Sequence, residues 1–175
     1  MSEIDLKSYI RDIPDYPKKG ILFHDITPLI KNPRAFKYTI DKIGDQISDV
    51  DLDYIVGIDA RGFIFASALS YKLYKGVILV RKPGKLPSDT LEASYELEYG
   101  TDKLEMHKDE VSPGDKVLIA DDLLATGGTA KAAGELIEKS GGEIAGYYFL
   151  IELTELKGSD KLNPHNIWST IKFPF

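Results

Sequence analysis

Hydrophobic residues gather in short blocks that have the length of β-strands, and stretches with helical spacing lie between them. Four continuous, mostly apolar runs cover residues 54–58, 76–80, 116–120 and 144–151. Helices are predicted after the first and third of these runs, from Gly62 to about Tyr74 and from about Thr129 to Ser140. Short, uniformly apolar strands that alternate with helices are typical of a parallel sheet covered on both faces. The pattern therefore predicts an α/β fold.

The N-terminal part of the chain has a different pattern. The prolines in Ile13–Pro17 prevent a continued helix, so an N-terminal segment is expected to end there. Asn32-Pro33 is a favourable cap and first-turn pair, and apolar residues follow at helical spacing from Phe36 to Ile47. A helix is therefore predicted to begin at this pair.

The segment from about residue 82 to residue 112 interrupts the alternation of strands and helices. A polar loop is followed by two stretches of alternating polarity, Tyr95–Tyr99 and Leu104–His107, on either side of Gly100-Thr101-Asp102. This arrangement predicts an antiparallel hairpin that projects from the sheet. A mobile flap in that position could close over the carboxyl ends of the strands, where open α/β sheets bind ligands.

Composition narrows the class of protein. A length of 175 residues suits one domain, and no repeat, low-complexity tract or linker is evident. Against 22 Lys and Arg stand 28 Asp and Glu, and the net charge of −6 argues against a general nucleic-acid or anionic-membrane binder. The absence of cysteine excludes disulfides, thiol catalysis and Cys-ligated zinc. The start Met1–Asp5 has neither the basic residues nor the apolar run of a secretion signal, so a soluble, cytoplasmic protein is expected.

The segment from Val117 to Thr129 carries the most specific chemical signal. An apolar strand is expected to end at two adjacent carboxylates, before a loop of small and hydroxylated residues and a helix start. Loop amides, threonine hydroxyls and the positive end of the helix dipole make an anion site sized for a phosphate. Since carboxylates repel phosphate, the acids suit the hydroxyls of a sugar that bears it. The implied ligand is a ribose 5-phosphate, and its candidate residues are Asp121, Asp122, Ala125, Thr126, Gly127, Gly128 and Thr129.

Taken singly, an acid pair at a strand end or a glycine pair in a turn has an ordinary structural explanation. The ordered combination is what indicates binding, because its parts solve one recognition problem in sequence. Neither of the two common phosphate motifs, Gly-x-x-x-x-Gly-Lys-Ser/Thr and Gly-x-Gly-x-x-Gly after a strand, is present.

This segment resembles the phosphoribosyl pyrophosphate (PRPP) signature of the type I phosphoribosyltransferases. Further segments are similar to the members of that family that use adenine, namely residues 20–28, 57–63, 81–87, 93–100 and 152–158. The resemblance covers nearly the whole chain. It implies a single domain over residues 1–175, with a mainly parallel sheet, a base-binding N-terminal segment (about residues 1–35) and a flexible hairpin within about residues 82–112. The implied reaction transfers the phosphoribosyl group of PRPP to adenine and forms AMP and pyrophosphate.

The resemblance also implies a pyrophosphate site. Its candidate residues are Asp59, Ala60, Arg61, Arg81, Lys82 and Lys85. By itself, an arginine at a helix start can be structural and a basic loop can be a solvated surface. A ligand with several negative charges favours binding, because those charges must be neutralised. Magnesium is expected to arrive on the pyrophosphate, so no protein metal ligand is predicted. In the family this basic loop reaches into the neighbouring subunit's site, which implies a homodimer.

Three residues are implied in adenine binding and three in catalysis. Phe23 would stack on one face of adenine and Leu153 would lie on the other, although an aromatic among apolar neighbours is also typical of a core. Common family members have arginine where this chain has His24, which leaves the contact at that position open. The catalytic candidates are Arg61, Glu98, for the purine proton, and Tyr99, to shield the reaction centre.

Two other functions remain open at this stage. One is the same reaction with hypoxanthine, guanine or xanthine, which Phe23, the Glu98-Tyr99 pair and residues 81–87 argue against. The other is a PRPP-sensing regulator without turnover. Regulators of that kind usually carry a nucleic-acid-binding module, for which 175 residues with a net charge of −6 leave no evident room.

Overall fold

A five-stranded parallel sheet forms the centre of the molecule. The computed structural model describes residues 3–96 and 100–174 of the chain. The strand order is β4-β3-β7-β8-β9, and every neighbouring pair is parallel. The strands are β3 (Tyr54–Ile58), β4 (Gly76–Val80), β7 (Lys116–Leu124), β8 (Glu143–Leu153) and β9 (Ile167–Phe173). The predicted α/β fold is confirmed, and β9 is an additional edge strand that the apolar pattern did not predict.

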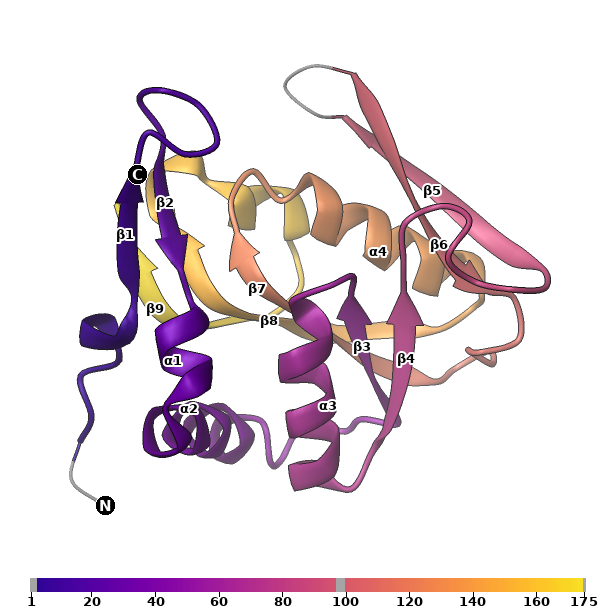
Figure 1. Ribbon diagram of the computed structural model, residues 1–175. Helices are drawn as coiled ribbons and strands as arrows, with labels where there is room; N and C mark the ends of the chain where they lie inside the picture. The colour runs from indigo at the N-terminus through magenta and orange to yellow at the C-terminus, as the bar shows by residue number, and fades with distance from the viewer. Residues whose placement is uncertain (1–2, 97–99, 175) are drawn as a thin grey trace.

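Helices cover both faces of this sheet (Figure 1). They are α1 (Thr27–Lys31), α2 (Pro33–Gln46), α3 (Gly62–Leu73) and α4 (Gly128–Lys139). Asn32 caps α2, because its side-chain oxygen accepts hydrogen bonds from the amides of Arg34 and Ala35. The three longer helices therefore begin within a residue of where the sequence predicts. Within residues 3–96 and 100–174, no helix combines the length and apolar character that crossing a bilayer requires.

The buried residues of the central strands explain why their sequences are uniformly apolar. Leu118 and Ala120 of β7 pack in one core cluster with α2 and α3, whereas Val117 and Ile119 pack in a second cluster with α4. Successive strand residues point to opposite faces, so a strand covered on both sides needs apolar residues at every position. The sheet is thus held by two cores, one on each face.

The N-terminal segment contains two strands of its own. β1 (Arg11–Pro14) and β2 (Leu22–Asp25) form a separate antiparallel sheet in which Ile13 lies opposite Phe23. Figure 1 shows this pair beside the end of β9, close to the C-terminus. The sequence pattern did not predict these strands, because each has four residues and Pro14 belongs to the first.

The predicted hairpin is confirmed. It consists of β5 (Thr90–Glu96) and β6 (Thr101–His107), which pair antiparallel from Thr90↔His107 to Glu96↔Thr101. Two backbone hydrogen bonds between Arg81 and Glu105 fasten β6 to the chain just after β4. The apolar side chains Ala93, Leu104 and Met106 are buried in the cluster that contains α4. The hairpin therefore packs along α4 (Figure 1).

One predicted boundary is wrong and changes the description of the site. β7 continues to Leu124, so Asp121 and Asp122 lie inside the strand and not at its end. The reason is the length of its neighbour: β8 has 11 residues and still pairs with β7 at Asp121↔Phe149 and Leu124↔Glu152. In the same way Thr101 and Asp102, expected in the hairpin turn, belong to β6.

Candidate functional site

A cavity of about 210 Å³ lies where β7 gives way to α4. It is lined by Arg61 and by the continuous segment of residues 121–130. All seven residues predicted for a ribose 5-phosphate are in this lining. The structure therefore brings together the acids of β7, the small-residue loop and the first turn of α4, whose unpaired backbone amides and positive dipole end suit an anion.

The loop of this cavity depends on two glycines that touch. Gly127 has φ +79°, and a Cβ atom there would lie 2.4 Å from the carbonyl oxygen of Gly158. Conversely, a Cβ on Gly158 would lie 2.2 Å from the carbonyl oxygen of Ala125. The loop is therefore backed by the start of the short 3₁₀ helix Gly158–Leu162. Gly158 was assigned no role from the sequence, although its segment 152–158 contributes to the family resemblance.

The two acids and Arg61 form one charged group. The Nε of Arg61 lies 3.0 Å from Oδ2 of Asp122, whose residue is 5% exposed. Burial raises the pKa of Asp121 well above its ordinary value, and the neighbouring charge of Asp122 adds to the rise. The pKa of Asp122 is also raised by burial, but Arg61 opposes that rise. Of the two acids, Asp121 is therefore the one that keeps a proton to the higher pH, and a carboxyl that keeps its proton can donate a hydrogen bond where a carboxylate can only accept.

The residues predicted for pyrophosphate are less free than the sequence suggests. Arg81 is paired with Asp59, with 3.0 Å between Nε and Oδ2, and Lys82 with Asp102, with 3.0 Å between Nζ and Oδ2. Among the ion pairs of the described residues, none involves Lys85. Two cations of the predicted basic patch, Arg81 and Lys82, are therefore already paired with acids that are distant in the sequence. Ala60 and Arg61 lie in the connection between β3 and α3.

Phe23 lies next to the charged cavity and not in the core. Its ring is 5.5 Å from the guanidinium carbon of Arg61, and the ring of Tyr16 meets it edge-on at 5.2 Å. Phe23 is half-buried and belongs to neither core cluster of the described residues. Arg61 thus contacts both the residue predicted for the base and an acid predicted for the sugar, although the three are far apart in the chain.

His24 does not lie with Phe23. Its ring stacks on Phe173 with 4.2 Å between centroids and an interplanar angle of 11°, and its Nδ1 is 2.7 Å from Asp12. Phe23 and His24 therefore lie in different surroundings, one beside Arg61 and the other against Phe173. Leu153 is buried at the end of β8, opposite Phe173 of β9. Glu98 and Tyr99 are outside the described residues.

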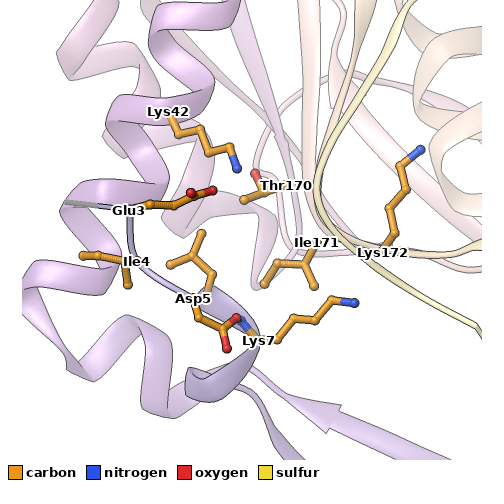
Figure 2. Close-up of a pocket in the computed structure, with 9 residues that line it drawn as sticks. Glu3, Ile4, Asp5, Lys7, Lys42, Thr170, Ile171 and Lys172 are labelled. Atoms are coloured by element: carbon orange, nitrogen blue, oxygen red, sulfur yellow. The ribbon is translucent and has the colours of Figure 1, made fainter. Parts of the chain in front are cut away.

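A second cavity, of about 470 Å³, lies between the N-terminal segment, α2 and β9 (Figure 2). Two of its three lysines already have partners: Lys7 lies over the ring of Phe173, and Lys172 is 3.2 Å from Glu152. None of the residues predicted for a site lines this cavity, and it is assigned no role.

Comparisons with known proteins show what this chain is similar to. The family model described as "Phosphoribosyl transferase domain" matches residues 30–174. The adenine phosphoribosyltransferase of Halothermothrix orenii is 56% identical over 169 residues, which cover 97% of this chain and 99% of that protein. The crystal structure of the adenine phosphoribosyltransferase from Thermoanaerobacter pseudethanolicus has a TM-score of 0.94 at 51% identity, covering 97% of this chain and 98% of that one. The Saccharomyces cerevisiae enzyme, crystallised with an imino-altritol bisphosphate and adenine, has a TM-score of 0.89 at 41% identity, covering 95% and 96%.

Proposed function

The chain belongs to the type I phosphoribosyltransferase family, among its adenine phosphoribosyltransferases, and we propose that the cavity between β7 and α4 is where it holds PRPP. Its activity is adenine phosphoribosyl transfer in purine salvage. The observation that carries the placement is the meeting of Asp121, Asp122 and Arg61 with the glycine loop in one cavity. The glycine loop, the acid pair and Arg61 correspond to the 5-phosphate, the ribose and the pyrophosphate of PRPP.

The 5-phosphate is assigned to the loop and the first turn of α4. Thr126 and Thr129 supply hydroxyl donors, and the amides of residues 125–129 supply the rest. The acid pair binds the 2- and 3-hydroxyls of the ribose. With a proton on Asp121 and a charge on Asp122, the pair can donate to one hydroxyl oxygen and accept from the other.

The pyrophosphate is assigned to Arg61 and to the loop that follows β4. Lys85 is the cation most available to it, and the side chain of Lys82, which contacts Asp102, is 57% exposed. Magnesium is proposed to arrive on the pyrophosphate, where it would shield the charge of the leaving group. The oxygen donors of the acid pair suit this hard cation. Among the described residues, no group of three or more Asp, Glu, His or Cys could hold a metal by itself.

The base is assigned to the face of Phe23, next to Arg61. Breaking the bond between C1′ and the pyrophosphate oxygen leaves positive charge on the ribose, in an oxocarbenium-like transition state. No covalent nucleophile is needed. The protein aligns base and sugar, stabilises the departing charge and excludes water. Glu98 and Tyr99 are proposed, from the family resemblance, to handle the purine proton and to shield the reacting carbon.

We also propose a homodimer, formed through α3 and β4. Tyr71 and Tyr74 at the end of α3 are 90% and 98% exposed, and Val77 and Leu79 of β4 are exposed beside them. β4 is an edge strand of the central sheet. Large apolar side chains exposed on neighbouring elements are typical of an interface. Because β4 leads directly into Arg81 and Lys82, an interface here would bring the basic loop close to the partner's site. The cytoplasm is the proposed location, since charged nucleotides do not cross membranes freely.

A base-panel assay tests the function. The purified chain is mixed with PRPP, Mg²⁺ and either adenine, hypoxanthine, guanine or xanthine, and released pyrophosphate is measured. Pyrophosphate release with adenine alone is expected. Faster pyrophosphate release with another base would show that this base, and not adenine, is the substrate. PRPP binding without pyrophosphate release under any condition would indicate a sensor. The variant Asp121→Ala/Asp122→Ala is the matched control for chemistry in the proposed cavity.

A further inference from the structure

One carboxylate of the hairpin holds two groups that come from different parts of the chain. Oδ2 of Asp102 lies 3.0 Å from Nζ of Lys82 and accepts a hydrogen bond from the hydroxyl of Tyr95 at 3.1 Å. Its other oxygen accepts from the amide of Lys103 at 2.8 Å. Asp102 and Tyr95 are direct cross-strand partners of β6 and β5. The side chain of Asp102 is therefore fixed by the hairpin itself.

Tyr95 connects this carboxylate to the phosphate loop. A Cβ on Gly128 would be in van der Waals contact with the ring of Tyr95, at 3.9 Å from Cδ2. The side chain of Thr129 is near enough to the Tyr95 hydroxyl to oppose the rise of its pKa. Burial and the neighbouring Asp102 raise the pKa of Tyr95, so the hydroxyl stays protonated and can donate to the carboxylate. Tyr95 thus lies between Asp102 and the first residues of α4.

Within residues 3–96 and 100–174, Asp102 is the one ion-pair partner of the Lys82 ammonium group. The Lys82 side chain is 57% exposed, and the contact with Asp102 raises its pKa, which keeps the ammonium charged. A lysine ammonium has three donors, so one contact with a carboxylate leaves two for another anion. A long, flexible side chain loses rotamer freedom when it binds a ligand, and prior contact with a fixed partner reduces that loss.

We propose that Asp102 is a positioning residue: held by Tyr95 and by the amide of Lys103, it orients Lys82 toward the pyrophosphate of PRPP. The proposal rests on the assignment of Lys82 to the pyrophosphate site under the proposed function. It applies equally whether that pyrophosphate lies in the same subunit's site or in the partner's.

The hairpin also supplies a matched control. Lys103 and Glu92 form an ion pair between the same two strands, with 2.8 Å between Nζ and Oε2. Neither lines the cavity between β7 and α4. Glu92→Gln and Asp102→Asn therefore each neutralise the acid of a lysine–acid pair in the hairpin. Only Asp102→Asn changes the residue that contacts Lys82.

The test compares two ligands on the full-length protein by calorimetry. AMP has the 5-phosphate and lacks the pyrophosphate, whereas PRPP with Mg²⁺ has both. For Asp102→Asn we expect the Kd of PRPP to rise about tenfold, the effect of losing one charge-assisted contact, and the Kd of AMP to stay within about twofold. Tyr95→Phe is expected to raise the Kd of PRPP about threefold, since the ring remains and only its hydroxyl is lost. Glu92→Gln is expected to leave both constants unchanged.

A double-mutant cycle separates positioning from general damage. In a Lys82→Met background, Asp102→Asn should weaken PRPP binding no further, because Asp102 acts through Lys82. Three results would overturn the proposal: a full additional loss in that background, equal losses for AMP and PRPP, or unchanged or tighter PRPP binding by Asp102→Asn. Failure of the proposed function has a different signature, a wild-type protein that binds neither ligand.

Discussion

The guanidinium of Arg61 forms an ion pair with the buried Asp122, and the same guanidinium lies 5.5 Å from the ring of Phe23. Arg61 begins the connection into α3, Asp122 lies inside β7, and Phe23 belongs to the separate N-terminal sheet. One side chain therefore links the proposed base site to the proposed sugar site. Displacement of the Arg61 side chain should weaken binding at both sites, because its guanidinium contacts a residue of each.

Removing the acid pair should abolish turnover and leave the fold intact. For Asp121→Ala/Asp122→Ala we expect kcat/KM for PRPP to fall by about 10²- to 10⁴-fold, since two contacts to charged or partly charged oxygens are lost at roughly 1.5–3 kcal/mol each. Steady-state kinetics measure the loss, and circular dichroism checks the fold. The exposed Asp49→Ala is the control. A near-normal kcat/KM for the double variant would show that the two acids are not needed for turnover.

The protonation of Asp121 predicts a pH dependence of stability. Its folded pKa is raised, so the folded state keeps a proton that the unfolded state releases, and the free energy of unfolding should fall as the pH rises above about 4. Asp121→Asn removes this dependence. We expect the variant to be more stable than the wild type at pH 7 by about 1–2 kcal/mol, while binding PRPP more weakly.

Urea unfolding of both proteins between pH 4 and pH 8 measures this difference. Using the difference cancels carboxylates such as Asp25, whose lowered pKa has the opposite effect on stability. A gap between wild type and variant that stays constant with pH would show that Asp121 does not carry the proton.

Phe23→Ala should weaken adenine binding selectively. Stacking of a base on an aromatic ring contributes roughly 1–3 kcal/mol, so the KM for adenine should rise about 10- to 100-fold. The Kd of PRPP should change little, because Phe23 meets the sugar site only through Arg61. Leu22→Ala, an exposed neighbour on β2, is the control. Equal losses for adenine and PRPP would contradict a base-specific role.

Gly127→Ala should damage the phosphate loop, whereas Gly128→Ala should be tolerated by the fold. At Gly127 a side chain would have φ +79° and meet backbone at 2.4 Å. The nearest atom to a Cβ on Gly128 is 3.6 Å away, an ordinary contact. We expect Gly127→Ala to lower the free energy of unfolding by at least about 2 kcal/mol. Thermal unfolding measures both variants, and similar melting temperatures would refute the difference.

Leu79→Glu should separate the proposed dimer. Placing a charge in an apolar interface leaves it desolvated and without a partner, at a cost of several kcal/mol. Sedimentation should give twice the 19.5 kDa chain mass for the wild type and the single-chain mass for the variant. Leu22→Glu, which changes an exposed apolar residue outside the patch, should remain dimeric. A wild type that sediments as a single chain would exclude the assembly.

The elements that the sequence predicted are those whose signal is local. β3 and β4 have the expected bounds, because each is a compact apolar run, although Val77 and Leu79 of β4 are exposed. β9 was missed since Ile167–Phe173 mixes apolar, hydroxyl and charged residues, as an edge strand allows. β1 and β2 were missed because four-residue strands produce too short an alternation to distinguish from a loop.

The same distinction holds in the site. The residues of the phosphate loop are continuous in sequence, so their order alone indicated an anion site. The pairs Arg61–Asp122 and Lys82–Asp102 join residues that are 61 and 20 positions apart. The pattern of hydrophobic and polar residues does not predict contacts of this kind. His24 was expected beside Phe23, but the alternation along β2 places it on Phe173. That alternation could have been inferred only once β2 was known to be a strand.

The position of the acid pair within β7 has a consequence for which sugars the enzyme admits. Asp121 pairs with Phe149 of β8 and Asp122 follows it inside the same strand, so their backbone cannot withdraw as a loop could. A 2-deoxyribose substrate would exclude water from one of the acids without offering it a hydrogen-bond partner. Leaving a buried polar group unpaired discriminates against an analogue more strongly than the loss of an apolar contact does. The rigidity of the sheet would thereby keep deoxynucleotides from being made by this route.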